Sequence, residues 1–345
     1  MKALFLAGGL GTRLKPLTDD VPKSMVPIMN KPLLERSMSN LKKHGIFDVV
    51  LSVGHKSEYI HDYFGDGRDF GMRIEYVFEE SPLGTGGAIK NTSHHFHSTF
   101  LVCNADILCN MNLTKLIAHH HAKAADVTIA VTEVSNPSAY GVIEYDQHEY
   151  ALSFTEKPKP SEVRSHLINA GIYVFEPHVL DAIPDDRPVS VERETFPKIL
   201  LKKNAIAIYN GCSYWMDIGT PEKYLQAHVD IMTGKCKLHG VDFDKGRIFM
   251  EGRSFIDGSA TITGPVYIGD NVQIGAHATV GPYAVIGDHV NIHPSGSITD
   301  SILWDHVDIG SFGSMSRVVA ASDCRVKRRS THQNMAFTKT SRVAW

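Results

Sequence analysis

The chain has 345 residues, of which 43% are hydrophobic and 21% charged, and its formal net charge is −3. This length suffices for two or three domains with cores of their own, and the near-neutral charge argues against a nucleic-acid or anionic-membrane partner. No apolar run reaches the roughly 18–20 residues of a membrane span, and five cysteines without metal-type spacing suggest reduced thiols in a cytoplasmic protein.

The first part of the chain alternates short β-like runs with helical stretches. We expect strands at 2–7, 47–53, 72–78, 99–106 and 126–134, and helices at 33–44, 57–64, from about 85, and at 113–121. Strands that alternate with helices are typical of a mostly parallel sheet covered on both faces, in which ligands bind at the carboxyl ends of the strands. The pattern therefore predicts an α/β domain at 1–235, with a Rossmann-like mixed, mostly parallel sheet and helices on both faces.

Beyond about residue 235 the pattern changes to a six-residue repeat. Eight apolar residues recur every six positions, and glycine follows four of them in succession. These apolar residues are Ile256, Ile262, Ile268, Ile274, Val280, Ile286, Ile292 and Ile298, and the glycines are Gly269, Gly275, Gly281 and Gly287. A period of six fits neither a helix nor an isolated strand, but it fits a parallel β-helix in which each hexapeptide forms one side of a triangular coil. A chance run of β-branched residues in a sandwich is the alternative.

The repeat also sets the expected boundaries of the second half. We expect a linker at 236–255, a β-helix of about two to three coils at 256–326, and a basic, polar and partly loose tail at 327–345. A solenoid offers flat, exposed faces, so we expect this region to serve oligomerisation or regulation in a homo-oligomer.

The first strand leads into a glycine-rich loop with basic residues behind it. The stretch "LAGGLGTRL" contains Gly8, Gly9 and Gly11, but it lacks both the lysine of a P-loop and the third glycine of a dinucleotide fingerprint. Backbone amides followed by Arg13, and then by Lys23 after a proline, suit a polyphosphate chain. A tight turn with a surface arginine is the alternative.

Two further features are candidates for the rest of a nucleotide site. The second Gly-rich turn, at 79–91, has no lysine at its head, which suggests a backbone surface for a nucleobase, although an ordinary helix entry would look the same. Asp106 and Asp217 each follow an apolar or aromatic strand, and two carboxylates beside an anionic substrate are what Mg²⁺ requires. A turn or a helix cap is the alternative for each aspartate.

Polar residues in two later segments complete the candidates. Glu156 and Lys157 follow a strand, and Asn169 and Gly171 lie in another. Together they would suit a hydroxyl-rich phosphorylated ligand, with a surface position as the alternative for each.

Histidines cluster in two other stretches, 94–97 and 119–121. Because consecutive side chains point in different directions, we interpret these clusters as solvated helix ends and not as metal sites.

Taken together, these motifs resemble the sugar-1-phosphate nucleotidyltransferases, also called NDP-sugar pyrophosphorylases. The resemblance runs from residue 1 to about 235 and rests on "LAGGLGTRL…PK" (6–23), "PLGTGGA" (82–88), "NAD" (104–106), "YGVIEYD" (140–146), "EKP" (156–158), "NAGIYVF" (169–175) and "WMDIGTPEKY" (215–224). The whole chain most resembles the mannose-1-phosphate guanylyltransferase branch with a C-terminal left-handed β-helix. "PLGTGGAIK" is also similar to the heptose-1-phosphate guanylyltransferases.

The resemblance implies a reaction and a role for each motif. An NTP and a sugar 1-phosphate, with GTP and mannose 1-phosphate as the expected pair, give an NDP-sugar and pyrophosphate by Mg²⁺-dependent in-line attack on the α-phosphorus. The catalytic residues are Arg13, Lys23 and Asp106, and the Mg²⁺ ligands are Asp106 and Asp217. The nucleotide-binding residues are Leu6, Ala7, Gly8, Gly9, Gly11, Thr12, Arg13, Leu83, Gly84, Thr85, Gly86 and Gly87. The sugar-phosphate-binding residues are Gly141, Glu156, Lys157, Asn169 and Gly171.

Other activities stay open at this point. A glucose-1-phosphate thymidylyl- or uridylyltransferase and a heptose-1-phosphate guanylyltransferase are alternatives within the same reaction class. Acyl transfer by the β-helix is an alternative of another class, with His289 and His293 as its candidate residues. A non-catalytic regulatory homologue would have lost the metal or pyrophosphate groups, and all of these are present.

Overall fold

The computed structural model describes residues 1–185, 187–243 and 247–345, and these divide into two compact units. The first unit contains Met1–Gly9 and Ser37–Trp215, and the second contains Leu10–Arg36 and Met216–Trp345. The first Gly-rich loop is therefore shared, since one unit ends at Gly9 and the other begins at Leu10. The domain boundaries expected at 235 and 255 stay predictions, and residues 244–246 of the expected linker lie outside the described residues.

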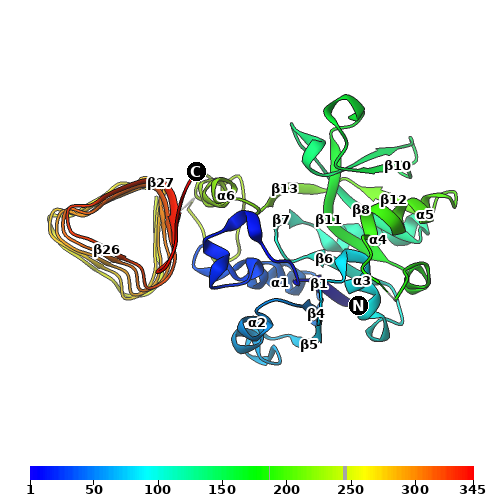
Figure 1. Cartoon of the computed structure of the whole chain (residues 1–345), viewed down its shortest axis with the longest axis horizontal. Helices are drawn as coiled ribbons and strands as arrows, with labels where there is room; N and C mark the ends of the chain where they lie inside the picture. The colour runs from blue at the N-terminus through cyan, green and yellow to red at the C-terminus, as the bar shows by residue number, and fades with distance from the viewer. Residues whose placement is uncertain (186, 244–246) are drawn as a thin grey trace. The chain divides into compact units, whose positions relative to one another are not determined.

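The first unit is built on a nine-stranded mixed sheet (Figure 1). Its strands are β1 Lys2–Leu6, β4 Asp48–Val53, β5 Arg73–Phe78, β6 Phe100–Asn104, β8 Val127–Glu133, β9 Gly141–Tyr145, β10 Ala151–Glu156, β11 Leu167–Phe175 and β12 Ile206–Tyr209. The order is β10-β9-β11-β6-β1-β4-β5, with β8 paired to β11 and β12 to β8. β1 runs parallel to β4 and β6, whereas β11 runs antiparallel to β6, β8 and β9. The expected mixed α/β sheet is confirmed, with its antiparallel part gathered around β11.

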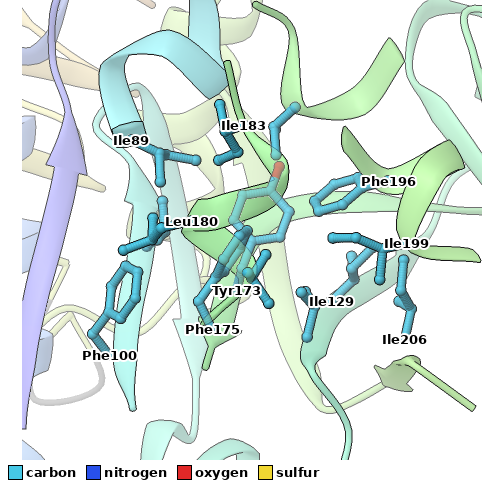
Figure 2. Close-up of a cluster of buried hydrophobic side chains, with 14 of the residues drawn as sticks. Ile89, Phe100, Ile129, Tyr173, Phe175, Leu180, Ile183, Phe196, Ile199 and Ile206 are labelled. Carbon is cyan, nitrogen blue, oxygen red and sulfur yellow. The ribbon is translucent and has the colours of Figure 1, made fainter. Parts of the chain in front are cut away.

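Helices follow the strands as the alternating pattern predicts. They are α1 Leu33–Lys43, α2 Ser57–Phe64, α3 Gly84–Asn91, α4 Leu113–Lys123 and α5 Phe196–Leu200. A core of aliphatic and aromatic side chains lies between the sheet and the helices α3 and α5, and it includes Phe100 of β6, Tyr173 of β11 and Phe196 of α5 (Figure 2). The rings of Tyr173 and Phe196 lie 5.5 Å apart. This packing fixes β6 and β11, whose polar ends carry candidate site residues. Among the described residues, no helix is long and apolar enough to cross a membrane.

The second unit contains a triangular parallel β-helix, the helix α6 Pro221–Met232 and the segment Leu10–Arg36 (Figure 1). One face of the β-helix is a five-stranded parallel sheet of β15 Phe255–Ile256, β18 Gln273–Ile274, β21 Asn291–Ile292, β24 Asp308–Ile309 and β26 Arg325–Val326. The other faces carry β14 Ile248–Met250, β17 Val266–Ile268, β20 Ala284–Ile286, β23 Ile302–Leu303, β16 Thr261–Ile262, β19 Thr279–Val280, β22 Ser297–Thr299, β25 Ser314–Ala320 and β27 Thr331–Phe337. The first half of β25 pairs with β22 and its second half with β23, so β25 joins these two faces.

The β-helix is longer than the repeat predicts. Five stacked strands on one face show that the expected two to three coils are too few. The spacing between equivalent residues falls from 18 to 17 beyond the third coil, so the six-residue pattern ends after Ile298 although the coil continues. The expectation of a partly loose tail is also wrong for 331–344. There β27 pairs with β25, and β28 Arg342–Ala344 pairs with β27.

Candidate functional site

The segment Leu10–Arg36 carries the basic residues of the first Gly-rich loop. Its second residue is Gly11, whose φ of 62° lies in the left-handed region. A Cβ on Gly11 would lie 2.9 Å from Cβ of Lys23, so glycine is required there and Lys23 lies against the loop. Arg13 is exposed, in the single turn Thr12–Leu14.

Arg13 and Asp217 converge at Gly219 within the second unit. A Cβ on Gly219 would lie 2.9 Å from Asp217 Oδ2 and 3.4 Å from Arg13 Nη2. Asp217 ends the strand β13 Cys212–Asp217 and forms an ion pair with Lys223. The side chain of Thr220 caps α6 by accepting from the Lys223 amide at 3.4 Å, which fixes Lys223 in the first turn. A guanidinium and a carboxylate thus meet at one glycine, and an ammonium is paired with the carboxylate; such an array can bind a metal-associated anion.

In the first unit, Glu79 links the two Gly-rich stretches. A Cβ on Gly8 would lie 2.6 Å from Glu79 Oε1, which also accepts from Ser52 Oγ at 2.8 Å. Glu79 Oε2 accepts from the Leu83 amide at 3.3 Å. Sequence reasoning missed Glu79, although it begins the second Gly-rich stretch, because its contact with Gly8 bridges distant parts of the chain.

The loop Leu83–Gly87 opens α3, and part of its backbone is already engaged. The amides of Gly86 and Gly87 donate to the Val189 carbonyl at 2.8 and 3.2 Å, and the Val189 amide donates to the Leu83 carbonyl at 2.8 Å. The helix entry that was the alternative is present, and recognition of a base by this loop stays a prediction. It would use the loop's other backbone groups, because those that contact Val189 are occupied.

Glu192 connects this loop with the candidate sugar residues, and sequence reasoning missed it. It accepts hydrogen bonds from Thr85 Oγ1 at 2.6 Å and from Ser190 Oγ at 2.7 Å. Burial, and next the charge of Glu192, raise the pKa of both Tyr173 and Glu156. The stretch "SVERETF" has neither a glycine turn nor a strand end that would have signalled a site.

The paired strands β9 and β10 bring Glu156 against Gly141. These two residues are partners in the antiparallel register, and a Cβ on Gly141 would lie 2.9 Å from Glu156 Oε2. Lys157 Nζ lies 3.7 Å from Glu156 Oε1, and the Lys157 side chain is 58% exposed. An exposed ammonium beside a half-buried carboxylate can bind a phosphate and a hydroxyl of the same ligand.

Because β11 runs antiparallel to β6, its first residues lie beside the end of β6. Gly171 has a φ of 70°, and a Cβ there would lie 2.6 Å from Asn104 Nδ2. Asn169 accepts from the Gly171 amide at 2.9 Å and donates to the Tyr173 hydroxyl at 2.7 Å. Asp106 lies two residues after Asn104, and its charge also contributes to the raised pKa of Tyr173, after burial and two glutamates. Asn104, Asp106, Asn169 and Gly171 therefore gather at one edge of the sheet.

The oxygen donors at this edge fit a magnesium ion. Asn104 Oδ1 is buried, and no hydrogen bond to it is found within the described part of the chain. The amide oxygen of Asn104 and the carboxylate of Asp106, two residues later in the chain, are hard ligands of the kind that Mg²⁺ prefers. Asp217 belongs to the other unit, so its role as a second ligand stays a prediction.

Two aromatic rings pack next to the same residues. The indole Nε1 of Trp215 donates to the carbonyl of Ala170 at 3.0 Å, and the ring of Tyr140 meets Trp215 edge-on at 5.3 Å. Ala170 lies between Asn169 and Gly171, so Trp215 supports the turn of backbone that presents them.

The histidines differ from the expected solvated helix ends at two positions: Nε2 of His119 is buried and its ring packs on Tyr209 at 5.3 Å, and His120 is buried as a whole. His120 is only 1% exposed, with Nδ1 2.8 Å from Thr128 Oγ1 and Nε2 3.1 Å from Glu176 Oε1. The interpretation is wrong for His120 because it lies on the face of α4 that packs on the sheet. In the β-helix, the ring of His289 stacks on that of His306 at 4.8 Å, and His293 Nε2 lies 3.4 Å from Asp308.

Comparison with known proteins assigns the family. The model described as nucleotidyl transferase matches residues 2–234, and the chain belongs to this family. A second model, described as the GMPPB C-terminal domain, matches residues 262–341.

Individual relatives match about two thirds of the chain. Mannose-1-phosphate guanylyltransferase of Mycobacterium tuberculosis is 41% identical over 234 residues, which cover 67% of this chain and 65% of that protein. UTP–glucose-1-phosphate uridylyltransferase of a Synechocystis species is 36% identical over 251 residues, which cover 69% and 65% of the two proteins. The crystal structure of HddC from Yersinia pseudotuberculosis complexed with GMP-PN has a TM-score of 0.56 and 33% identity, and covers 66% of this chain and 97% of that one. The chain thus spans about 65% of the length of these two curated relatives.

Proposed function

We propose that this chain makes an NDP-sugar and pyrophosphate from an NTP and a sugar 1-phosphate, with GTP and mannose 1-phosphate as its substrates. Membership of the nucleotidyl transferase family and similarity to a mannose-1-phosphate guanylyltransferase support the proposal. The observation that carries it is the convergence of Arg13 and Asp217 on Gly219, with Lys23 packed against Gly11. These residues have the charges that a nucleoside triphosphate and its cation need.

The proposed reaction needs no protein nucleophile. An oxygen of the sugar 1-phosphate forms a bond to the α-phosphorus of the NTP, while the bond from that phosphorus to the bridging oxygen breaks and pyrophosphate leaves. Positioning and charge neutralisation therefore supply the catalysis. Arg13 would bind the departing pyrophosphate, and Lys23 the phosphate that reacts. Mg²⁺, held by Asp106 and Asp217, would neutralise charge on the phosphate oxygens.

The other motifs would hold the two organic parts of the substrates. Leu83–Gly87 and the backbone of the first Gly-rich loop would bind the nucleoside. Lys157 would bind the phosphate of the sugar, and the carboxylate of Glu156 would accept hydrogen bonds from sugar hydroxyls, as would Asn169 through its amide. Assembly into a homo-oligomer stays a proposal that size measurement in solution would test.

A substrate screen tests the proposal. The full-length chain would be incubated with Mg²⁺, each of GTP, ATP, UTP, dTTP and CTP, and mannose, glucose or heptose 1-phosphate, and pyrophosphate release would be followed. We expect the highest kcat/KM with GTP and mannose 1-phosphate, and GDP-mannose as the product in mass spectrometry. A preference for UTP or dTTP with glucose 1-phosphate would overturn the assignment of guanine as the base and mannose as the sugar. No pyrophosphate with any pair would overturn the reaction class.

A further inference from the structure

The segment Leu10–Arg36, which carries Arg13 and Lys23, has little regular structure of its own. Before α1 begins at Leu33, its elements are the single turns η1 Thr12–Leu14, η2 Leu17–Asp19 and η3 Lys23–Met25 and the two-residue strands β2 Pro27–Ile28 and β3 Lys31–Pro32. Such short elements make few internal hydrogen bonds and are marginally stable alone. Contacts with other elements of the second unit, among them those with α6, therefore help to fix its shape.

A buried chain of hydrogen bonds joins this segment to the β-helix. Trp304 Nε1 donates to the Tyr224 hydroxyl at 3.0 Å, and the Tyr224 hydroxyl donates to the carbonyl oxygen of Pro27. The direction is fixed because an indole N–H can only donate, so the hydroxyl accepts from it and gives its own hydrogen to Pro27. Tyr224 is 0% and Trp304 5% exposed, so removal of either group leaves a buried polar partner unsatisfied.

Two more side chains hold the residues that follow Pro27. The Met29 amide donates to His228 Nε2 at 3.3 Å, and Arg36 donates to the carbonyls of Ile28 at 3.0 Å and Met29 at 2.5 Å. His228 lies one turn after Tyr224 on α6, and their rings meet edge-on at 4.7 Å. Side chains thus anchor the backbone shortly after Lys23.

Trp304 itself departs from the repeat of the β-helix. The register pairs Ile268 with Ile286 and Ile286 with Leu303, so Trp304 stands where the two preceding coils have Gly269 and Gly287. The coil does not need a large side chain at this position. The indole instead packs against the Tyr224 ring, edge-on at 6.5 Å. The one departure from glycine along these three coils therefore coincides with the contact to α6.

We propose that Tyr224 and Trp304 are positioning residues for nucleotidyl transfer. Through the indole N–H and the tyrosine hydroxyl, the β-helix holds Pro27, and thereby Lys23 and Arg13, in the geometry that binds the phosphates. Neither residue touches the substrate in this proposal. The inference rests on the proposed phosphate-binding role of Arg13 and Lys23, and it gives the β-helix a part in catalysis beyond assembly.

Phenylalanine variants of the full-length chain test the inference, because they remove a single hydrogen-bonding group and keep an aromatic ring. We expect Tyr224→Phe and Trp304→Phe to raise KM for the NTP about tenfold, with a smaller change in KM for the sugar 1-phosphate. Trp304→Gly should raise it further, because glycine suits the coil but removes the whole contact. The matched control is Tyr150→Phe, which removes a tyrosine hydroxyl that donates to the Lys123 carbonyl at 2.9 Å in the first unit. It should change only the thermal midpoint.

A double-mutant cycle separates the two proposals. If Tyr224 acts through Arg13, Tyr224→Phe and Arg13→Lys will have non-additive effects on KM for the NTP. Parental KM and kcat in Tyr224→Phe, together with an impaired Arg13→Lys, would overturn the positioning role and leave the proposed function intact. Parental kinetics in Arg13→Lys would instead overturn the phosphate-binding role from which the inference starts.

Discussion

Lys223 forms an ion pair with Asp217, six residues earlier in the chain and at the end of the strand that precedes α6. The Lys223 side chain is 33% exposed and the Asp217 side chain 13%, so the pair is partly open to solvent and adds only modest stability; the role proposed for the Asp217 carboxylate is to bind the metal and the phosphates. We expect Asp217→Asn to lower kcat by about 100-fold or more while the thermal midpoint changes little. Steady-state kinetics and thermal melts would check both values.

The matched control for this prediction is Asp230→Asn. Asp230 also lies in α6 and pairs with a lysine, Lys235, at 3.2 Å, but it has no place among the candidate site residues. We expect it to keep the parental kcat. Near-parental turnover in Asp217→Asn would refute the assignment of this carboxylate to the metal and phosphates.

Among the candidate sugar-binding residues, Gly171 combines a left-handed backbone conformation with no room for a side chain. Its φ is 70°, and a Cβ would lie 2.4 Å from Ile107 Cδ1 and 2.6 Å from Asn104 Nδ2. Gly171→Ala should therefore displace Asn104, lower kcat/KM for the sugar 1-phosphate, and reduce the free energy of unfolding. Gly45→Ala is the control, because Gly45 has a φ of 73° with nothing within 4 Å. It should cost only the backbone strain, about 1 kcal/mol, and no activity. Equal effects of the two variants on activity would contradict the prediction.

The ionised carboxylate of Glu156 should reduce stability at pH 7 and support activity. Burial, and then the nearby Glu192, raise the pKa of its carboxyl, so the folded state holds the proton more tightly than the unfolded chain. Stability from this group is fully present below the unfolded pKa and is lost as the pH rises through the folded one. Glu156→Gln should therefore raise the thermal midpoint at pH 7 but not at pH 4, and should lower kcat/KM for the sugar 1-phosphate.

The control for Glu156 is Glu149, a carboxyl whose pKa is lowered and not raised. Lys123 donates to Glu149 and lowers the pKa of that carboxyl, so Glu149→Gln should not raise the midpoint at pH 7. A stabilised and fully active Glu156→Gln would show that the carboxylate does not contact the sugar.

Local patterns in the sequence suffice for most elements of the first unit. The run at 2–7 became β1, and the amphipathic stretch at 33–44 became α1, because apolar spacing and flanking turns are properties of neighbouring residues. The same holds for the β-helix, whose repeat is local. The number of coils was underestimated because loss of a single residue from one coil hides the later repeats.

What the sequence could not show depends on distant contacts. Glu192 accepts a hydrogen bond from Thr85, 107 residues away in the chain. The Tyr224 hydroxyl donates to the carbonyl of Pro27, which follows Lys23 and lies 197 residues from Tyr224. No periodicity links such positions. Trp304 gave a weak signal in the sequence, because a tryptophan stands where the preceding coils have glycine. Only the structure shows that this side chain contacts Tyr224 of α6.

His228 should make the protein sensitive to acid. Burial lowers its pKa to about 4, and the neutral ring donates from Nδ1 to the Tyr224 carbonyl at 2.8 Å and accepts at Nε2 from Met29. Between pH 6.5 and pH 4, His228 is protonated in the unfolded chain but stays neutral in the folded one. The free energy of unfolding therefore falls as the pH drops from 6.5 towards 4. The loss is about 1.4 kcal/mol per pH unit and roughly 3 kcal/mol in all.

Urea denaturation at pH 7.5 and pH 5 would measure this loss, with His228→Gln as the variant that cannot titrate. We expect the parent to lose more stability than His228→Gln between the two pH values. His97→Gln, which replaces an exposed histidine, should behave like the parent. The protonated His228 ring could no longer accept from Met29, so the KM for the NTP should also rise at low pH in the parent. The same pH dependence of stability in the parent and in His228→Gln would show that this ring is protonated without cost, and that the anchor of Met29 does not require its neutral form.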